Sequence, residues 1–196
     1  IVLALSSYKF TTLELSITIL NTESELIEAC IRKETWAQQR VYEEHYTKML
    51  GVCLRYANSQ DDALDILHDG FLKVFLNIHS YEIGTQFSAW IRRIMVNTSI
   101  DYYRKEHRRI TSDIDDAKTL TVYSSNPIDT MTLEEVMGAM QKLSPTYRSV
   151  LNLYVVDGYS HKEVSEMLGI TESTSRSNLV KARQKLKEIL KEGNGE

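Results

Sequence analysis

The chain has 196 residues, of which 42% are hydrophobic and 26% are charged, and it contains only two prolines and eight glycines. This mixture is typical of a globular protein, and abundant Leu, Glu and Lys with so few helix breakers favour an all-α fold. The formal net charge of −4 argues against a uniformly basic nucleic-acid-binding protein, so the distribution of charge along the chain carries more information than the total.

Two features bear on the compartment. Cys30 and Cys53 lack the spacing of metal ligands, so we expect buried, reduced thiols in a cytoplasmic protein without metal or other cofactor. Residues 1–21 lack the basic start of a signal peptide, and Lys9 and Glu14 interrupt them too often for a membrane span. We leave them unassigned, as an extension or as residues encoded upstream, and expect no membrane insertion.

The first expected domain covers residues 22–109 and begins with two helices. Thr22 and Glu25 form a possible capping box, and a helical apolar pattern follows through Leu26, Ile27, Cys30, Ile31 and Trp36. A second helical run is predicted over residues 40–57. Its expected buried residues are Val41, Tyr42, Tyr46, Met49, Leu50, Cys53 and Leu54.

An acidic helix is predicted next, starting at Ser59 and Asp62. Residues 59–82 contain five acidic residues and one lysine. The acidic face carries Asp61, Asp62, Asp65 and Asp69, while Ala63, Leu64, Leu67, Phe71, Val74, Phe75 and Ile78 recur at helical spacing. Phosphates repel such a face, so we expect it to bind a basic protein partner.

A loop at residues 82–85 separates this helix from a long basic helix over residues 87–107. Phe87, Trp90, Ile91, Ile94, Met95, Thr98 and Tyr102 form its predicted inward stripe. Residues 87–109 carry six basic and two acidic residues, with Tyr102 and Tyr103 among them. Basic residues mixed with aromatic ones suit partly single-stranded nucleic acid, because rings stack on unpaired bases. We expect Tyr103 and the arginines to make contact, whereas Trp90 is at least as compatible with a core position.

Residues 110–131 are rich in Ser, Thr and Asp and predict an acidic linker, and residues 132–191 form a second helical domain followed by a tail at 192–196. Ser160 and Glu163 predict a capping box, Gly169 a turn, and Thr171 the cap of a final helix. Residues 172–187 contain five basic residues and one acidic residue. This helix-turn-helix pattern with a basic second helix suits the major groove of DNA.

Three segments together resemble the bacterial RNA polymerase sigma factors, closely the extracytoplasmic-function group with only the second and fourth conserved domains. The segments are DDALDILHDGFLKVF, FSAWIRRIMVNTSIDYYRKEHRR and LSPTYRSVLNLYVVDGYSHKEVSEMLGITESTSRSNLVKARQKL. The resemblance covers residues 26–190 and implies two helical domains that bind core RNA polymerase and promoter DNA. It also implies sequestration by an anti-sigma protein.

The resemblance assigns three sets of residues. Binding to the clamp helices of the largest polymerase subunit falls to Asp61, Asp62, Asp65, Asp69, Phe71 and Phe75. Contact with the −10 element falls to Arg92, Arg93, Asn97, Asp101, Tyr103, Arg104 and Arg108, with the loop at 80–86 receiving a flipped-out base. Contact with the −35 element falls to Ser173, Thr174, Arg176, Ser177, Lys181, Arg183 and Lys185.

Two positions depart from the family pattern. His68 and Asp69 stand where Gln and Glu are common, which bears on the polymerase contact, and Asn178 stands where a basic residue is frequent. The −35 sequence preference therefore cannot be transferred from the family.

Other classes of function remain open. Asp61, Asp62 and Asp65 form a DDxxD pattern that binds Mg²⁺ in all-helical prenyl synthases, but no second acidic motif accompanies it, so we expect no catalytic residues. A helix-turn-helix regulator acting without polymerase leaves the acidic helix and the basic aromatic helix unexplained. A purely protein-binding helical module would not need two basic faces.

Overall fold

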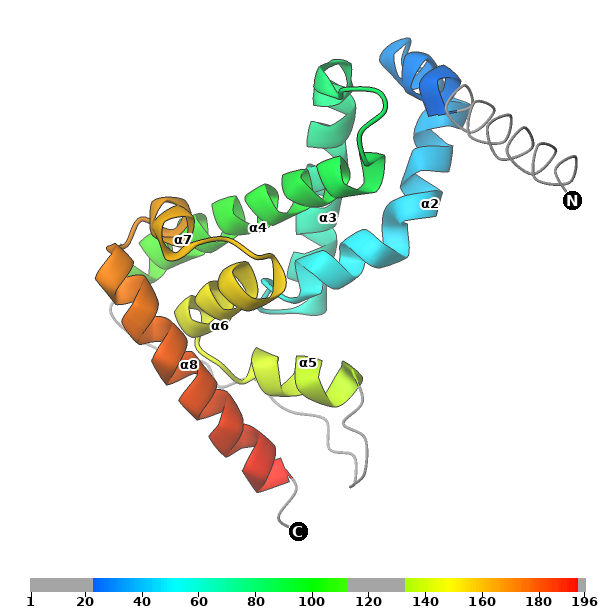
Figure 1. The fold of residues 1–196 in the computed structure, drawn as a ribbon. Helices are drawn as coiled ribbons and strands as arrows, with labels where there is room; N and C mark the ends of the chain where they lie inside the picture. Colours follow the sequence, from blue (N-terminus) through cyan, green and yellow to red (C-terminus); the bar gives the residue numbers. More distant parts are fainter. Residues whose placement is uncertain (1–22, 113–132, 194–196) are drawn as a thin grey trace, which may run out of the picture.

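The computed structural model describes residues 23–112 and 133–193, and these residues are helical with no β-strand among them (Figure 1). The N-terminal unit, residues 23–112, contains a short helix at 23–31, α2 (Thr35–Leu54), α3 (Gln60–Asn77), the 3₁₀ turn η1 (Ile78–Ser80) and α4 (Phe87–Ser112). The C-terminal unit, residues 133–193, contains α5 (Leu133–Gln141), α6 (Pro145–Leu151), the π-helical turn η2 (Asn152–Val156), α7 (His161–Leu168) and α8 (Glu172–Gly193). The all-α prediction is confirmed.

The N-terminal unit is a helical bundle in which α2, α3 and α4 pack against one another (Figure 1). Ser59 begins α3 by accepting the backbone N–H of Asp62 at 3.1 Å, as its sequence predicts. Ile27, Val41, Leu67 and Ile91 are fully buried between the helices. α3 and α4 therefore pack side by side, and each leaves its outer face free of the other helix.

The second helix starts earlier than expected. Lys33 has a φ of 63°, a left-handed conformation that ends the first helix, and α2 begins at Thr35 rather than at residue 40. The continuous stripe through Ile31 and Trp36 was a wrong prediction, since both side chains are exposed. The turn at Lys33 rotates these positions away from the core, and the Trp36 indole donates to the Glu34 carboxylate instead.

The C-terminal unit packs α5, α6 and α7 against α8. Ser144 caps α6 by accepting the backbone N–H of Tyr147, and Pro145 occupies the first turn of that helix, where its missing N–H costs no hydrogen bond. Val150, Leu153, Val164 and Ala182 are fully buried within this unit.

Several boundaries differ from the sequence-based expectations or fall outside the described residues. α4 extends to Ser112, beyond the predicted end at residue 107. The whole extension at 1–21, the Thr22 cap, most of the acidic linker at 110–131 and the last three residues of the tail lie outside the described residues. No helix in the described part of the chain is long and apolar enough to cross a membrane.

Candidate polymerase and nucleic-acid interfaces

The turn of the helix-turn-helix is built by local hydrogen bonds. The Ser160 hydroxyl accepts the backbone N–H of Glu163 at 3.3 Å, and the Glu163 carboxylate accepts the backbone N–H of Ser160 at 2.8 Å. Gly169 ends α7 with a φ of 68°, which an L-residue adopts only under strain, and Thr171 accepts the N–H of Thr174 at 3.1 Å. The predicted capping box, glycine turn and second cap are all confirmed.

Buried side chains fix the angle between the two helices. Leu179 and Ala182 of α8 are buried, and the Ser175 hydroxyl lies 2.9 Å from Nδ1 of His161. The His161 ring stacks on Tyr154 at a centroid distance of 4.2 Å, so this histidine has a structural role that the sequence did not indicate. The first turn of α8 is thereby held against the start of α7.

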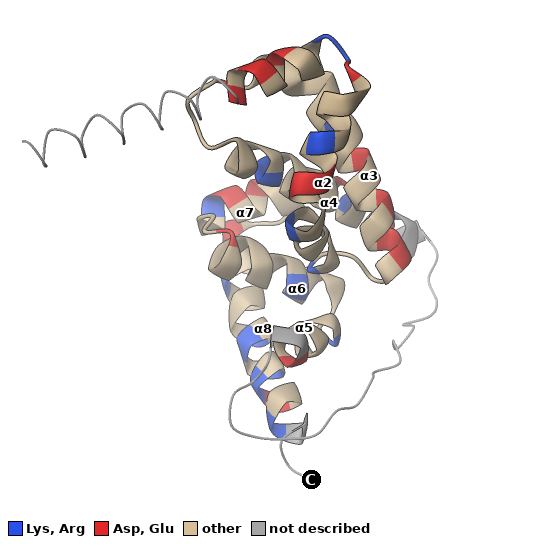
Figure 2. Cartoon of the chain, turned by 90° about the vertical axis from the view of Figure 1, so that its right-hand side faces the viewer, with Lys and Arg blue, Asp and Glu red and all other residues tan. Residues whose placement is uncertain are grey.

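The outward face of α8 is basic along its length, and Figure 2 shows lysine and arginine gathered on this helix. All of the residues predicted to contact the −35 element lie on it, exposed except for the half-buried Thr174: Ser173, Thr174, Arg176, Ser177, Lys181, Arg183 and Lys185. Arg176 pairs with the Glu172 carboxylate and Lys185 with that of Glu188 at 3.2 Å. Both pairs are exposed, so their guanidinium and ammonium groups can exchange partners at little cost.

The sequence-based interpretation missed one residue of this face. Val180 is 66% exposed in the middle of the basic surface, one helical turn from Arg176 and Ser177. An exposed apolar side chain there can meet the methyl group of thymine in the major groove. The signal in the sequence was that Val180 falls outside the Leu179, Ala182, Leu186 stripe.

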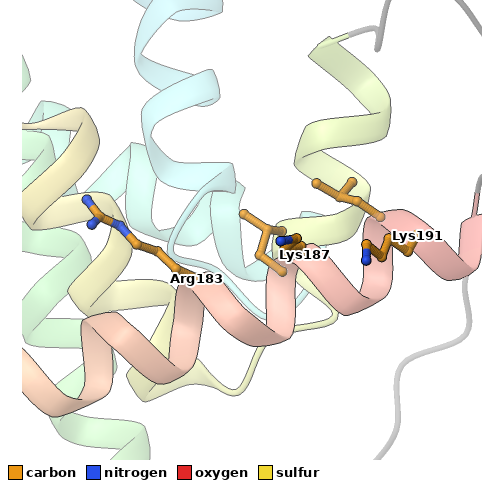
Figure 3. Close-up of a pocket in the computed structure, with 5 residues that line it drawn as sticks. Arg183, Lys187 and Lys191 are labelled. Atoms are coloured by element: carbon orange, nitrogen blue, oxygen red, sulfur yellow. The ribbon is translucent and has the colours of Figure 1, made fainter.

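The far half of α8 borders a shallow groove beside α5, with a volume of about 300 Å³. Figure 3 shows Arg183, Lys187 and Lys191 placed at successive turns along it, and Leu186 and Leu190 complete its lining.

On α3, the acidic face is exposed at three of the four predicted positions (Figure 2): Asp61, Asp65 and Asp69. Asp62 is half-buried, because its carboxylate accepts the Ser59 hydroxyl at 2.7 Å and also interacts with the Tyr102 hydroxyl. Asp62 therefore stabilises the N-terminus of α3 as well as contributing to the acidic face.

The exposed apolar residues of this face lie one position after the predicted phenylalanines. Phe71 is only 3% exposed and packs on Tyr42 at a ring distance of 4.7 Å, so it supports α3 from inside, and Phe75 is half-buried. Leu72 and Leu76 are 62% and 72% exposed instead, one turn apart beside the carboxylates.

The residues predicted to contact the −10 element lie along α4 but fall into two groups. In the first group, Arg93, Asn97, Asp101 and Arg108 are exposed to solvent. The second group contacts the C-terminal unit and consists of Arg92, Tyr103 and Arg104, of which Arg104 is also exposed. Tyr103, a predicted contact residue, is only 4% exposed in this structure, and its hydroxyl lies 3.0 Å from that of Thr146.

Comparison with known proteins decides the family. Residues 41–109 match the model of Sigma-70 region 2, and residues 133–186 match that of Sigma-70, region 4. The chain is 31% identical over 137 residues to the ECF RNA polymerase sigma factor EcfG of Rhodopseudomonas palustris (strain TIE-1), covering 68% of this chain and 74% of that protein. It is 32% identical over 137 residues to the RNA polymerase sigma factor SigZ of Bacillus subtilis (strain 168), covering 68% and 75%. The chain belongs to the extracytoplasmic-function (ECF) sigma factors.

A solved structure shares the fold of this sigma factor. The sigma factor RpoE from Bartonella quintana, crystallised in complex with the anti-sigma factor NepR, aligns with a TM-score of 0.51 at 21% identity. The alignment covers 78% of this chain and 96% of RpoE.

The loop that precedes α4 in this sigma factor is anchored by aromatic residues. Tyr81 is buried against Phe87 and Trp90, at ring distances of 4.8 and 5.5 Å, and its hydroxyl donates to the Thr85 carbonyl at 2.6 Å. Trp90 is half-buried in this cluster, as its core interpretation required. The loop tip at Gly84, with a φ of 95°, is exposed and free of packing.

The contact between the two units of the sigma factor is polar and centres on one carboxylate. The Asp157 side chain, which is almost fully buried, pairs with Arg92 of α4 and lies 3.4 Å from Nη2 of Arg55. It also accepts the Tyr56 hydroxyl. Beside it, Arg104 donates to the backbone carbonyl of Glu166 at 3.0 Å.

An arginine of the C-terminal unit crosses the same boundary in the opposite direction. Arg148 of α6 is 1% exposed and donates to the Asn58 side chain at 2.6 Å, to the Tyr56 carbonyl at 3.3 Å and to the Gln141 side chain at 2.8 Å. All three acceptors are neutral, and burial lowers the pKa of this guanidinium to about 10, so it stays charged near neutral pH. No sequence motif distinguished Arg148 from a surface arginine.

The described residues contain no group of three or more His, Cys, Asp or Glu side chains that could hold a metal ion. Burial raises the pKa of the Cys30 thiol to about 11 and that of Cys53 to about 12, and both thiols are free and buried.

Proposed function

We propose that this sigma factor binds core RNA polymerase and directs it to promoters through three separate surfaces. α3 contacts the polymerase clamp helices, α4 with the loop at 81–86 reads and opens the −10 element, and α8 reads the −35 element. The observation that carries the proposal is the segregation of charge (Figure 2): an acidic face on α3 stands beside a basic α4, and a capped helix-turn-helix ends in a basic α8. The division into residues 22–109, 110–131 and 132–191 is part of the same proposal.

The polymerase surface is best described as Asp61, Asp65 and Asp69 around Leu72 and Leu76. Carboxylates steer a basic partner, while two adjacent exposed leucines supply the apolar contact that holds it. Phe71 and Phe75 keep α3 in place from beneath and act as positioning residues.

The −35 surface uses the first turns of α8 for base edges and the later turns for phosphates. Ser173, Arg176 and Ser177 lie near the helix N-terminus, with Val180 beside them, and Lys181, Arg183 and Lys185 follow. This order matches the way a recognition helix enters the major groove.

Two further properties belong to the proposal. The role requires no catalytic residue, because the polymerase performs the chemistry in the cytoplasm, where it meets this factor. An anti-sigma protein regulates the factor by covering the same faces, and this role is supported by the RpoE structure, in which the sigma factor is bound to the anti-sigma factor NepR.

The test is run-off transcription with purified core polymerase on a pool of promoter fragments, with and without the protein. Protein-dependent start sites that share two spaced elements support the proposal and supply the consensus. Tight duplex binding by the protein alone, without dependent transcripts, would instead favour a free-standing helix-turn-helix regulator.

Polymerase binding is tested separately by titration of immobilised core enzyme. Asp65→Arg and the pair Leu72→Ser with Leu76→Ser are each expected to weaken binding, because they reverse a charge or remove the apolar contact. Glu43→Arg makes the same charge change on the exposed face of α2 and serves as the matched control. Equal affinity of Asp65→Arg and Glu43→Arg would rule out the acidic face as the contact.

A further inference from the structure

The contact between the two units covers part of the proposed −10 surface. Arg92 is paired with Asp157, Arg104 donates to the Glu166 carbonyl, and Tyr103 is buried beside Thr146. Each of these groups would have to face DNA to act on the −10 element. Promoter DNA and the C-terminal unit therefore compete for the same face of α4.

At Arg92, the Asp157 carboxylate and a DNA phosphate would compete for the same guanidinium group. Its guanidinium is partly exposed and holds a carboxylate, an anion that offers the same paired oxygens as a phosphate. A DNA phosphate can replace the Asp157 carboxylate on Arg92 without leaving that arginine unpaired. Asp157 thus occupies the site that the DNA backbone would take.

The interface also carries features of a contact that opens. Three buried side-chain atoms in the described part of the chain have no hydrogen-bond partner, namely Arg55 Nε, Arg148 Nε and Asn152 Oδ1. All three residues bridge the two units, since Arg55 lies near Asp157, Arg148 donates to Asn58, and Asn152 donates to the Arg55 carbonyl at 2.8 Å. Separation would expose these atoms to water and relieve the cost of leaving them unpaired.

Loose packing at the boundary also indicates a contact that can open. A cavity of about 170 Å³ lies in the boundary, lined by Tyr56, Asn58, Tyr102, Tyr103, Glu106 and His107 of the N-terminal unit and by Pro145 and Thr146 of the C-terminal unit. A domain core is filled to the density of a crystal, whereas contacts between domains are more polar and form and break more readily.

We propose that the free sigma factor is held in an autoinhibited closed form by a latch, made by Asp157 with Arg55 and Arg92, by Arg148 with Asn58 and by Gln141 with the Leu54 carbonyl. The latch must open before α4 can engage the −10 element. This inference rests on the proposed −10 role of α4 and adds its regulation.

The experiment measures the closed population and DNA binding in the same full-length molecules. Donor and acceptor dyes are placed on Thr47→Cys in α2 and Lys191→Cys in α8, both exposed positions away from the boundary. Energy transfer between the dyes reports the closed fraction, and fluorescence anisotropy reports binding to a pool of random-sequence single-stranded DNA.

Asp157→Asn opens the latch, because it leaves Arg55 and Arg92 facing each other without a carboxylate. Gln141→Ala is a second, milder opening variant, since its side chain accepts from Arg148 and donates to the Leu54 carbonyl at 2.5 Å. Glu44→Gln, an exposed residue of α2 paired with Arg40, gives the same charge change as Asp157→Asn and is the matched control.

We expect lower energy transfer in both opening variants and not in the control. The apparent dissociation constant for single-stranded DNA should fall by the same factor by which the open fraction rises. Unchanged transfer in both Asp157→Asn and Gln141→Ala overturns the latch, and so does opening without any gain in DNA affinity over Glu44→Gln. Opening with the expected gain in affinity, but no transcription with core polymerase by any form, would keep the latch and refute the proposed function.

Discussion

Gly70 gives the sharpest test of how α3 and α4 are held together. It lies in the buried face of α3, and a Cβ built on it would come within 2.3 Å of Sδ and 3.0 Å of Cε of Met95 on α4. Met95 is itself fully buried, so its thioether has little room to move aside. The glycine therefore leaves room for the Met95 side chain where the two helices that carry the proposed polymerase and −10 surfaces meet.

Two opposing effects determine how Gly70→Ala changes the free energy of unfolding. Replacing glycine by alanine inside a helix favours folding by about 1 kcal/mol. Forcing a methyl group into a packed core costs about 1–3 kcal/mol. We expect a net destabilisation of about 1 kcal/mol from these two figures.

A second substitution, Met95→Ala, should turn the effect of Gly70→Ala from destabilising to stabilising. Met95→Ala removes the atoms that clash, although it costs about 2–5 kcal/mol by leaving a cavity. In that background Gly70→Ala meets empty space and should stabilise by about 1 kcal/mol. The coupling between the two sites is then about 2 kcal/mol, within the range for residues in contact.

The assay is equilibrium unfolding in urea, followed by tryptophan fluorescence. Both tryptophans, Trp36 and Trp90, lie in the N-terminal unit, so the signal reports that unit. Gly51→Ala on α2 is the control, because its Cβ would meet nothing within 4 Å. If Gly70→Ala stabilised the protein as much as Gly51→Ala does, the close approach of α3 and α4 would be refuted.

Three other predictions concern the cap of α7, the recognition helix α8 and the Cys53 thiol. Ser160→Ala should destabilise the C-terminal unit by about 1 kcal/mol in thermal unfolding followed by circular dichroism, because α7 loses its cap. Hydrogen bonds from Ser160 lower the pKa of the Glu163 carboxyl, so the half of the capping box that this carboxylate makes is present above pH 4.5 and is lost as the pH falls through the lowered pKa. Arg176→Ala should reduce discrimination between −35 sequences by about 1–3 kcal/mol in competition binding. Cys53 should react with thiol reagents only as fast as the N-terminal unit opens, because burial raises its pKa to about 12.

Each of these has an outcome that contradicts it. An unchanged melting temperature for Ser160→Ala would mean that α7 does not depend on the capping box. A loss of affinity for Arg176→Ala that is uniform across −35 sequences would make it a phosphate contact. Rapid labelling of Cys53 without denaturant would contradict its burial.

Local signals in the sequence were sufficient for the helices and for the helix-turn-helix. Ser160 with Glu163, Gly169 and Thr171 act within four residues of themselves, so their chemistry does not depend on the rest of the molecule. The same holds for the basic character of α8 and the acidic character of α3. These features predicted the architecture and the candidate surfaces before any tertiary contact was known.

The spacing of apolar residues was a less reliable guide to which neighbouring side chain is buried and which is exposed. Phe71 fits the inward stripe of α3, and its burial makes Leu72 the exposed neighbour, yet the sequence favoured the aromatic residue as a contact. Ile31 and Trp36 were placed on one helix because the left-handed turn at Lys33 has no glycine or proline to mark it.

Only the tertiary structure decided what the C-terminal unit covers. Tyr103 and Arg92 lie on the side of α4 that meets this unit, and Arg148 is buried by residues about ninety positions earlier in the chain. A helical pattern shows which residues share a face, but it contains no information on whether solvent, DNA or another part of the chain lies against that face. That depends on contacts between distant segments, whose free energy is set by burial and charge pairing in three dimensions.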